Sequence, residues 1–182
     1  TANLRRSNIR KTKNDKVDTY IIIKALTLGN YSLISTRDIN NLKLKGLCRS
    51  RRNLVTMRSK AKIQLVSYID QIFPELSKFF KGNIHLNVSY QLLKQFSSPN
   101  EIKNLHLTKL TNILRDNSRG RYGKEDAIYL KELAKTSVGI YNPSICLQIK
   151  HDIFQIELYA SQIEEVEELY KQIIDEMDIK PL

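Results

Sequence analysis

The chain has 182 residues, which is enough for one domain or for two small helical units joined by a linker. Leucine, isoleucine and lysine dominate its composition, and six glycines and four prolines supply few breaks, so the composition favours helix. A net charge of +11 points to a polyanionic partner, nucleic acid before an acidic membrane, and no apolar run reaches the ~18 residues of a membrane span.

Cysteine and histidine usage narrows the chemistry further. Two cysteines, Cys48 and Cys146, are too few for a zinc site or a disulfide framework, so we predict two buried or partly buried thiols in a reducing cytoplasm. The histidines His85, His106 and His151 are scattered without metal-ligand spacing. We therefore interpret them as ordinary surface or packing residues.

Residues 1–13 form a basic arm without an acidic side chain. The arm lacks strong apolar periodicity, which predicts an extended or loosely ordered conformation. Its five candidate nucleic-acid-binding residues are Arg5, Arg6, Arg10, Lys11 and Lys13.

Two aspartates follow the arm at the start of a predicted helix. Asp15 and Asp18 are three residues apart, so both carboxylates can lie on one helix face and bind one divalent metal ion. A second interpretation stays open, in which Asp15 is the N-cap and Asp18 favours the helix dipole. The predicted helix runs from Asp15 to Leu28 with Gly29 at its C′ position, and its apolar run Tyr20–Ile23 predicts cover on more than one side.

A second, long helix is predicted to start after Ser35 or Thr36 and to stop at Pro74. Its apolar residues recur mostly at steps of three, four and seven, which is typical of a coiled-coil stripe: Leu44, Leu47, Leu54, Ala61, Leu65, Tyr68 and Ile72. A helix of this length cannot bury such a stripe alone, so it needs a partner.

The same helix has an unusual charge. From Ile39 to Ile69 it carries eight basic residues and no acidic one, whereas exposed helices normally mix both signs. A solvated face is one interpretation. Our hypothesis is that this helix follows phosphates by sequence-independent contacts, with six candidate residues Arg49, Arg51, Arg52, Arg58, Lys60 and Lys62.

The middle of the chain, from Gly82 to Pro143, predicts several short helices. They are expected over Val88–Phe96, from the capping box that begins at Ser98, over Thr108–Asn117 and over Lys124–Thr136. The segment between the last two contains Arg119 and Arg121 around a glycine and before a tyrosine. This segment is either a plain turn or a site that binds a phosphate or stacks on a base.

The last segment opens with Asn142-Pro143, a helix start, and continues without a breaker to Pro181. Ile149, Ile156, Ile163, Tyr170 and Met177 follow at strict seven-residue steps, which predicts a coiled coil or a long antiparallel hairpin with the basic helix. Packing within one chain and self-association both explain these heptads.

Charge divides the chain into two parts. Residues 143–182 hold nine acidic and three basic residues, net −6, so residues 1–142 hold +17. The acidic helix is therefore expected to neutralise part of the basic helix and to leave the arm and the outer basic face for binding.

The segment Lys11–Thr19, K-T-K-N-D-K-V-D-T, resembles a motif of a bacterial insertion-sequence transposase family. In that family the motif is followed by a basic helix, a Phe-Pro-Glu-Leu break, a helical insert and a second long helix. This order is similar to LKGLCRSRRNLV at Leu44–Val55, then Phe73–Leu76, then Ile145–Met177 here. The family has Ala where this chain has Thr19.

The resemblance implies a RuvC-like nuclease domain with an Asp-Glu-Asp-Asp carboxylate set and a later serine-bearing transposase domain. By this resemblance Asp15 and Asp18 are the last two carboxylates, catalytic residues that help to bind Mg²⁺. The chain is then expected to be a middle segment, inactive alone, of a bacterial cytoplasmic enzyme of DNA transposition. Some family members are guided by a structured bridge RNA, so the implied partners are DNA and a guide RNA.

We therefore predict an all-α, elongated fragment in which two long helices form a coiled-coil-like hairpin with a small helical insert. Its expected parts are the end of the nuclease domain (1–34), the basic helix (35–81), the insert (82–142) and the acidic heptad helix (143–182). The expected function is nucleic-acid binding, homo-oligomerisation and half of a metal site, without membrane contact. Two alternatives are a protein–protein adaptor and a non-catalytic nucleic-acid-binding regulator.

Overall fold

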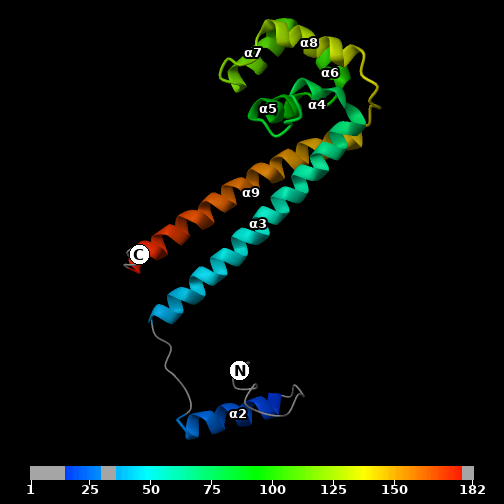
Figure 1. Ribbon diagram of the computed structural model, residues 1–182. Coiled ribbons are helices and arrows are strands. Elements are labelled where there is room, and N and C mark those ends of the chain that lie inside the picture. Colours follow the sequence, from blue (N-terminus) through cyan, green and yellow to red (C-terminus); the bar gives the residue numbers. More distant parts are fainter. Residues whose placement is uncertain (1–14, 30–35, 178–182) are drawn as a thin grey trace. The chain divides into compact units, whose positions relative to one another are not determined.

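The computed structural model describes residues 15–29 and 36–177, with side chains from residue 18 and from residue 39 onward in these two stretches. All regular secondary structure in these stretches is helical, so the predicted all-α class is confirmed (Figure 1). The chain divides into two compact units, residues 1–43 and 44–182. Within the described ranges no helix is both long enough and apolar enough to cross a membrane.

The first unit contains helix α2, Asp15–Thr27. The helix ends before Gly29, whose φ of +67° confirms the predicted glycine stop. Ala25 is buried, but Tyr20 is 66% exposed and Ile23 is 56% exposed. The cover predicted for this apolar run is therefore not supplied by the described residues of the unit.

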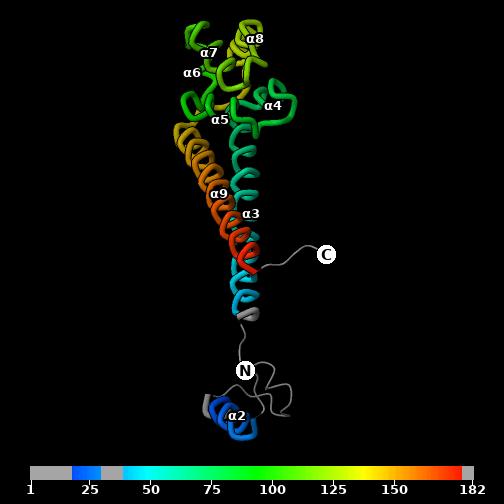
Figure 2. The backbone as a smooth tube through the Cα atoms, turned by 90° about the vertical axis from the view of Figure 1, so that its left-hand side faces the viewer, coloured from blue at the N-terminus to red at the C-terminus, as the bar shows by residue number. Residues whose placement is uncertain are grey.

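Two long helices dominate the second unit. Helix α3, Thr36–Ile72, belongs to this unit from Leu44 onward, and helix α9, Pro143–Glu176, lies alongside it in both views (Figures 1 and 2). Helix α3 ends before Pro74, because the proline ring excludes the helical conformation of the residue before it. Helix α9 begins as predicted, with the Asn142 side chain accepting a hydrogen bond of 2.9 Å from the Ser144 N–H. We call these two helices, from residue 44 onward, the stalk.

Five short helices join the two long ones and form what we call the head, residues 73–142. They are α4 (Glu75–Phe79), α5 (Asn87–Gln95), α6 (Pro99–Asn104), α7 (Leu107–Asn117) and α8 (Lys124–Lys135). The capping box predicted at Ser98 is present, with both of its reciprocal hydrogen bonds. Helix α4 was not predicted, because five residues are too few to show a periodic pattern.

The hydrophobic core joins the head to the adjacent half of the stalk. In α3 the buried residues are Ala61, Leu65, Ile69 and Ile72, whereas Leu44, Leu47 and Leu54 are only half-buried. In α9 the heptad residues Ile149 and Ile156 are buried among head side chains. Far from the head, Ile163 and Ile173 of α9 are buried as well, so the apolar stripe of α3 is less completely buried there than that of α9.

One carboxylate in the core is unsatisfied. Asp152 on α9 is 4% exposed, and its Oδ2 atom has no hydrogen-bond partner in the described part of the chain. Burial raises the pKa of this carboxyl, although the nearby His151 opposes the rise.

A short segment between α8 and α9 crosses the end of α3, and we call residues 137–140 the strap. The Ile140 N–H donates a hydrogen bond of 3.1 Å to the Gln71 carbonyl. The Glu75 carboxylate accepts hydrogen bonds from the Ser137 hydroxyl at 2.7 Å and from the Val138 N–H at 3.1 Å. Burial acts to raise the pKa of Glu75, but these hydrogen bonds outweigh it and lower that pKa.

Candidate functional site

The carboxylate pair predicted to bind metal begins helix α2. Asp15 is the first helical residue and Asp18 follows one turn later, half-buried and not free of contacts. The side chain of Asp15 lies outside the described residues, as do the arm residues Arg5, Arg6, Arg10, Lys11 and Lys13. Among the side chains that are described, no three His, Cys, Asp or Glu residues gather as metal ligands would.

The basic residues of α3 in the second unit separate into two sets. Four of them recur at steps of four, three and eight residues, which keeps them on one side of the helix over a length of ~22 Å. All four are exposed, and we call this set the outer face: Lys45, Arg49, Arg52 and Lys60. The sequence predicted one basic surface, and only the last three of these four stood among its candidates.

The other set points towards α9 and the head. Arg51 pairs with Glu167 of α9, with 2.6 Å between Nε and Oε1, so an acid of α9 engages one of these cations. Arg58 and Lys62 are half-buried and lie one turn apart. Their charges act on head residues. The charge of Arg58 opposes a rise in the pKa of Tyr90, and the charge of Lys62 adds to the lowering of the pKa of His85 by burial.

The head residues that face this inner set are linked to each other. The Tyr90 hydroxyl and the His85 Nδ1 atom are 2.9 Å apart. Burial and the charge of Glu157 raise the pKa of Tyr90 to about 12 in spite of Arg58. Burial together with Lys62 lowers the pKa of His85. The spacing of residues in the sequence did not indicate that His85 and Tyr90 lie near Lys62 and Arg58, because these cations are more than twenty residues away along the chain.

The candidates Arg119 and Arg121 lie in the turn between α7 and α8, and both are exposed. Arg119 has a φ of 57°, and the turn is closed by a 2.9 Å hydrogen bond from the Gly120 N–H to the Arg115 carbonyl. The neighbouring Tyr122 stacks on Phe79 with ring centroids 5.5 Å apart. One face of the Tyr122 ring therefore packs on Phe79 in the head core and is not available to stack on a base. The exposed side chains of Arg119 and Arg121 are the polar groups of this turn.

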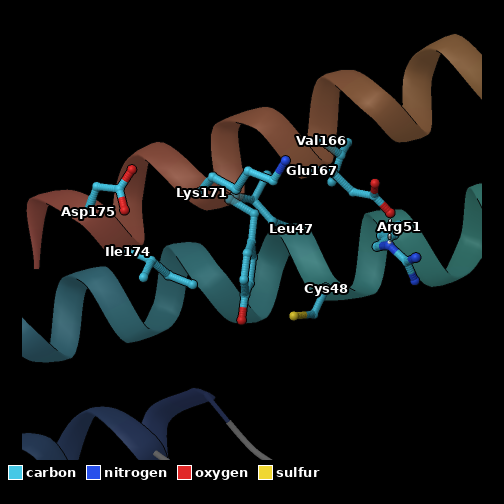
Figure 3. A pocket seen from close by; sticks show the side chains of 9 residues that line it. Leu47, Cys48, Arg51, Val166, Glu167, Lys171, Ile174 and Asp175 are labelled. Atoms are coloured by element: carbon cyan, nitrogen blue, oxygen red, sulfur yellow. Dashed lines mark hydrogen bonds and ion pairs between the residues drawn. The ribbon is translucent and has the colours of Figure 1, made fainter. Parts of the chain in front are cut away.

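A groove of about 500 Å³ lies between α3 and α9 in the half of the stalk far from the head (Figure 3). Its apolar walls come from Leu47 on α3 and from Val166, Tyr170 and Ile174 on α9. Charged side chains flank these walls, and Cys48 also lines the groove. The described residues of the second unit therefore leave these half-buried heptad residues of the stalk partly exposed to solvent. The Cys48 thiol is exposed, so the prediction of a buried or partly buried thiol is wrong for Cys48, whereas Cys146 is half-buried as predicted.

Comparison with known proteins adds one finding. No curated protein and no solved structure matches the chain at a significant level. Residues 1–74, which contain α2 and all of α3, match the family model DEDD_Tnp_IS110, described as Transposase. This segment of the chain is therefore similar to transposases of the IS110 family.

Proposed function

We propose that this chain binds the nucleic acid of a transposition complex along the outer face of α3, as part of an IS110-type transposase. The observation that carries the proposal is the separation of charge on α3: Arg51 pairs with α9, whereas the outer face is exposed and forms no ion pair in the described residues. Phosphates are the fitting ligands, because a row of cations along a helix contacts a backbone without reading bases.

Salt dependence tests the proposal. Affinity for duplex DNA and for a structured RNA is expected to fall linearly on a plot of log K against log salt concentration. Both ligands belong in the test because a guide RNA presents the same phosphate chemistry as DNA. A flat plot for both would contradict the proposal.

The proposal extends to Asp15 and Asp18 as two carboxylates of a Mg²⁺ site for strand cleavage, with the other ligands from outside this chain. Two carboxylates one helical turn apart fit this ion, because Mg²⁺ is usually bound by one or two carboxylates together with substrate phosphates. Bound Mg²⁺ would stabilise negative charge on a phosphoryl oxygen. In the whole transposase, strand exchange would also use the serine of a separate domain.

Replacing both aspartates by asparagine separates metal binding from helix capping. Both residues lie in the first turn of α2, where a neutral amide loses only the ~0.3–1 kcal/mol that a carboxylate gains from the helix dipole, so the variant D15N/D18N should nearly keep the thermal stability of this chain. The same change in the whole transposase should lower Mg²⁺-dependent strand cleavage at least tenfold, since neutral amides are poorer ligands for Mg²⁺. Cleavage at the unchanged rate would show that the two residues only stabilise the first turn of α2.

We also propose that the groove between α3 and α9 is covered by a second copy of this chain. Its apolar walls are of the kind that coiled-coil partners fill, and α3 and α9 carry opposite charges, so the stalk of one copy is complementary to that of another. Two stalks packed side by side would bury the heptad residues that one chain leaves half-buried.

Sedimentation equilibrium tests this dimer. The variant V166E/I174E places charges in the apolar groove and is expected to sediment as a monomer at concentrations where the unaltered chain is a dimer. Leu158→Glu is the matched control, because Leu158 is an exposed apolar residue of α9 that does not line the groove. A monomeric unaltered chain at ~100 µM would exclude a dimer of ordinary strength.

A further inference from the structure

A polar cluster lies where the head meets the stalk, and we call it the junction site. His85 before α5 and Tyr90 on α5 form its hydrogen-bonded pair, and Arg58 and Lys62 on α3 are the cations whose charges act on that pair. We propose that the junction site binds one phosphate group of the nucleic acid. This inference rests on the proposed function and adds a contact outside the outer face of α3.

The Tyr90–His85 hydrogen bond prepares the imidazole ring for this role. Tyr90 is 8% exposed, and in the described residues its hydroxyl has no partner other than the Nδ1 atom of His85. The phenol keeps its proton at neutral pH, so we assign it as the donor to Nδ1. With this assignment the neutral ring carries its proton on Nε2, which forms no hydrogen bond within the described part of the chain.

The two cations of the junction site lack an anionic partner. Neither Arg58 nor Lys62 forms a hydrogen bond or an ion pair with any described residue, although both are half-buried. The acid that acts on Tyr90 is Glu157, and the Lys94 ammonium already occupies both of its carboxylate oxygens at 2.6 and 2.7 Å. Half-buried cations without a counter-charge favour the arrival of an external anion.

Phosphate fits these donors better than a carboxylate does. A guanidinium, an ammonium and an imidazole N–H offer donors from two separate segments of the chain, and a tetrahedral phosphate can accept from several directions. The competing ligand is a planar carboxylate from α9 of a second copy. If that carboxylate is the ligand, removing the charges of Arg58 and Lys62 should weaken a dimer, whereas if phosphate is the ligand, it should weaken nucleic-acid binding.

The junction site predicts a coupling between binding and protonation. The groups that act on the His85 ring are Lys62 from α3 and Tyr90 from α5, with Arg58, Lys94 and Glu157 next to them. An anion beside the ring favours the imidazolium form, so binding should raise the pKa of His85 from its lowered value to above 6.5. The complex then takes up a proton, and affinity should increase as the pH falls from 7.5 to 6.

Proton NMR of the histidine rings in the whole chain tests this coupling directly. The ring signals of His85 are assigned with the variant His85→Gln, and their pH titration is recorded alone, with inorganic phosphate and with a 20-base-pair DNA duplex. The His85 pKa is expected to lie below 6.5 in the free chain and to rise above 6.5 with DNA. Inorganic phosphate at the same micromolar concentration should leave it unchanged, because a single ion lacks the other contacts of the duplex.

Charge-removing variants complete the test. R58Q/K62Q should bind DNA about tenfold more weakly at pH 6 and should lose the pH dependence, since charged hydrogen bonds of this kind are removed. The matched control K103Q/K124Q removes the same charge from exposed head residues and should stay within about threefold of the unaltered chain.

The outcomes separate this inference from the proposed function. If the unaltered chain binds no nucleic acid, the proposed function fails and the junction site with it. If the chain binds, but the pKa of His85 does not move and R58Q/K62Q behaves like its control, only the junction site is overturned. It is also overturned if R58Q/K62Q dissociates a dimer and leaves DNA affinity unchanged.

Discussion

Gly139→Ala is expected to lower the free energy of unfolding of the second unit by about 3 kcal/mol or more. A Cβ atom at this position would overlap the carbonyl group of Ile72 and would lie 3.0 Å from the Phe73 N atom. Because these neighbours are backbone atoms at the end of α3, no side-chain rotation can relieve the overlap. The strap has to move away from the helix.

Moving the strap breaks the hydrogen bonds that join it to the end of α3 and to α4. The bond from the Ile140 N–H to the Gln71 carbonyl would be lost, and the Glu75 carboxylate would lose its two donors in the strap. Thermal unfolding followed by circular dichroism should show a melting temperature lower by roughly 6–12 °C for a chain of this size.

Gly46→Ala is the matched control for this prediction. Gly46 lies inside α3, and an added Cβ would meet nothing within 4 Å. Alanine is the better helix former, so this variant should be more stable by about 1 kcal/mol. Equal melting temperatures for the two variants would contradict the tight passage of the strap over α3.

Neutralising the outer face of α3 is expected to have the largest effect on nucleic-acid binding. The variant replaces four cations by glutamine, which forms helix about as well as lysine and arginine, so α3 should persist. If all four contact phosphates, the slope of log K against log salt concentration should become shallower by roughly three to four. Relative to an unchanged affinity at ~1 M salt, this corresponds at ~0.1 M salt to an affinity loss of about three to four orders of magnitude. The variant is K45Q/R49Q/R52Q/K60Q.

A control with the same change in net charge distinguishes a binding face from a general attraction. Four exposed lysines of the head can be replaced together, and they are Lys103, Lys109, Lys124 and Lys135. This variant should change the slope by less than about one, since long-range attraction is screened at ~0.15 M salt. Equal losses for the two variants would mean that the outer face of α3 is not the contact surface.

Local sequence signals predicted the helices well, because each signal acts within a few residues. The Ser98 capping box, the Asn142-Pro143 start and the glycine stop at Gly29 all lie where the structure has a helix end. The heptads of the last helix also indicated which of its residues face a partner, and Ile149 and Ile156 are buried as that pattern requires. The motif around Asp15 and Asp18 lies inside the segment that matches the transposase family.

Contacts between distant residues were decided by the tertiary structure. Periodicity could not show that Ala61, Leu65, Ile69 and Ile72 of α3 are buried while Leu44, Leu47 and Leu54 are only half-buried, because that depends on where the five head helices pack. The packing of α9 against one side of α3 divides the basic residues of α3 into a paired inner set and an exposed outer face. His85, which its sequence context marked as ordinary, lies beside Tyr90 and within the field of Lys62. The helices depend on interactions between residues close in sequence, so the sequence by itself determined them. Hydrogen bonds and charge interactions also join residues that are far apart in sequence but close in space. Which of these side chains meet was therefore decided only by the packing of the helices.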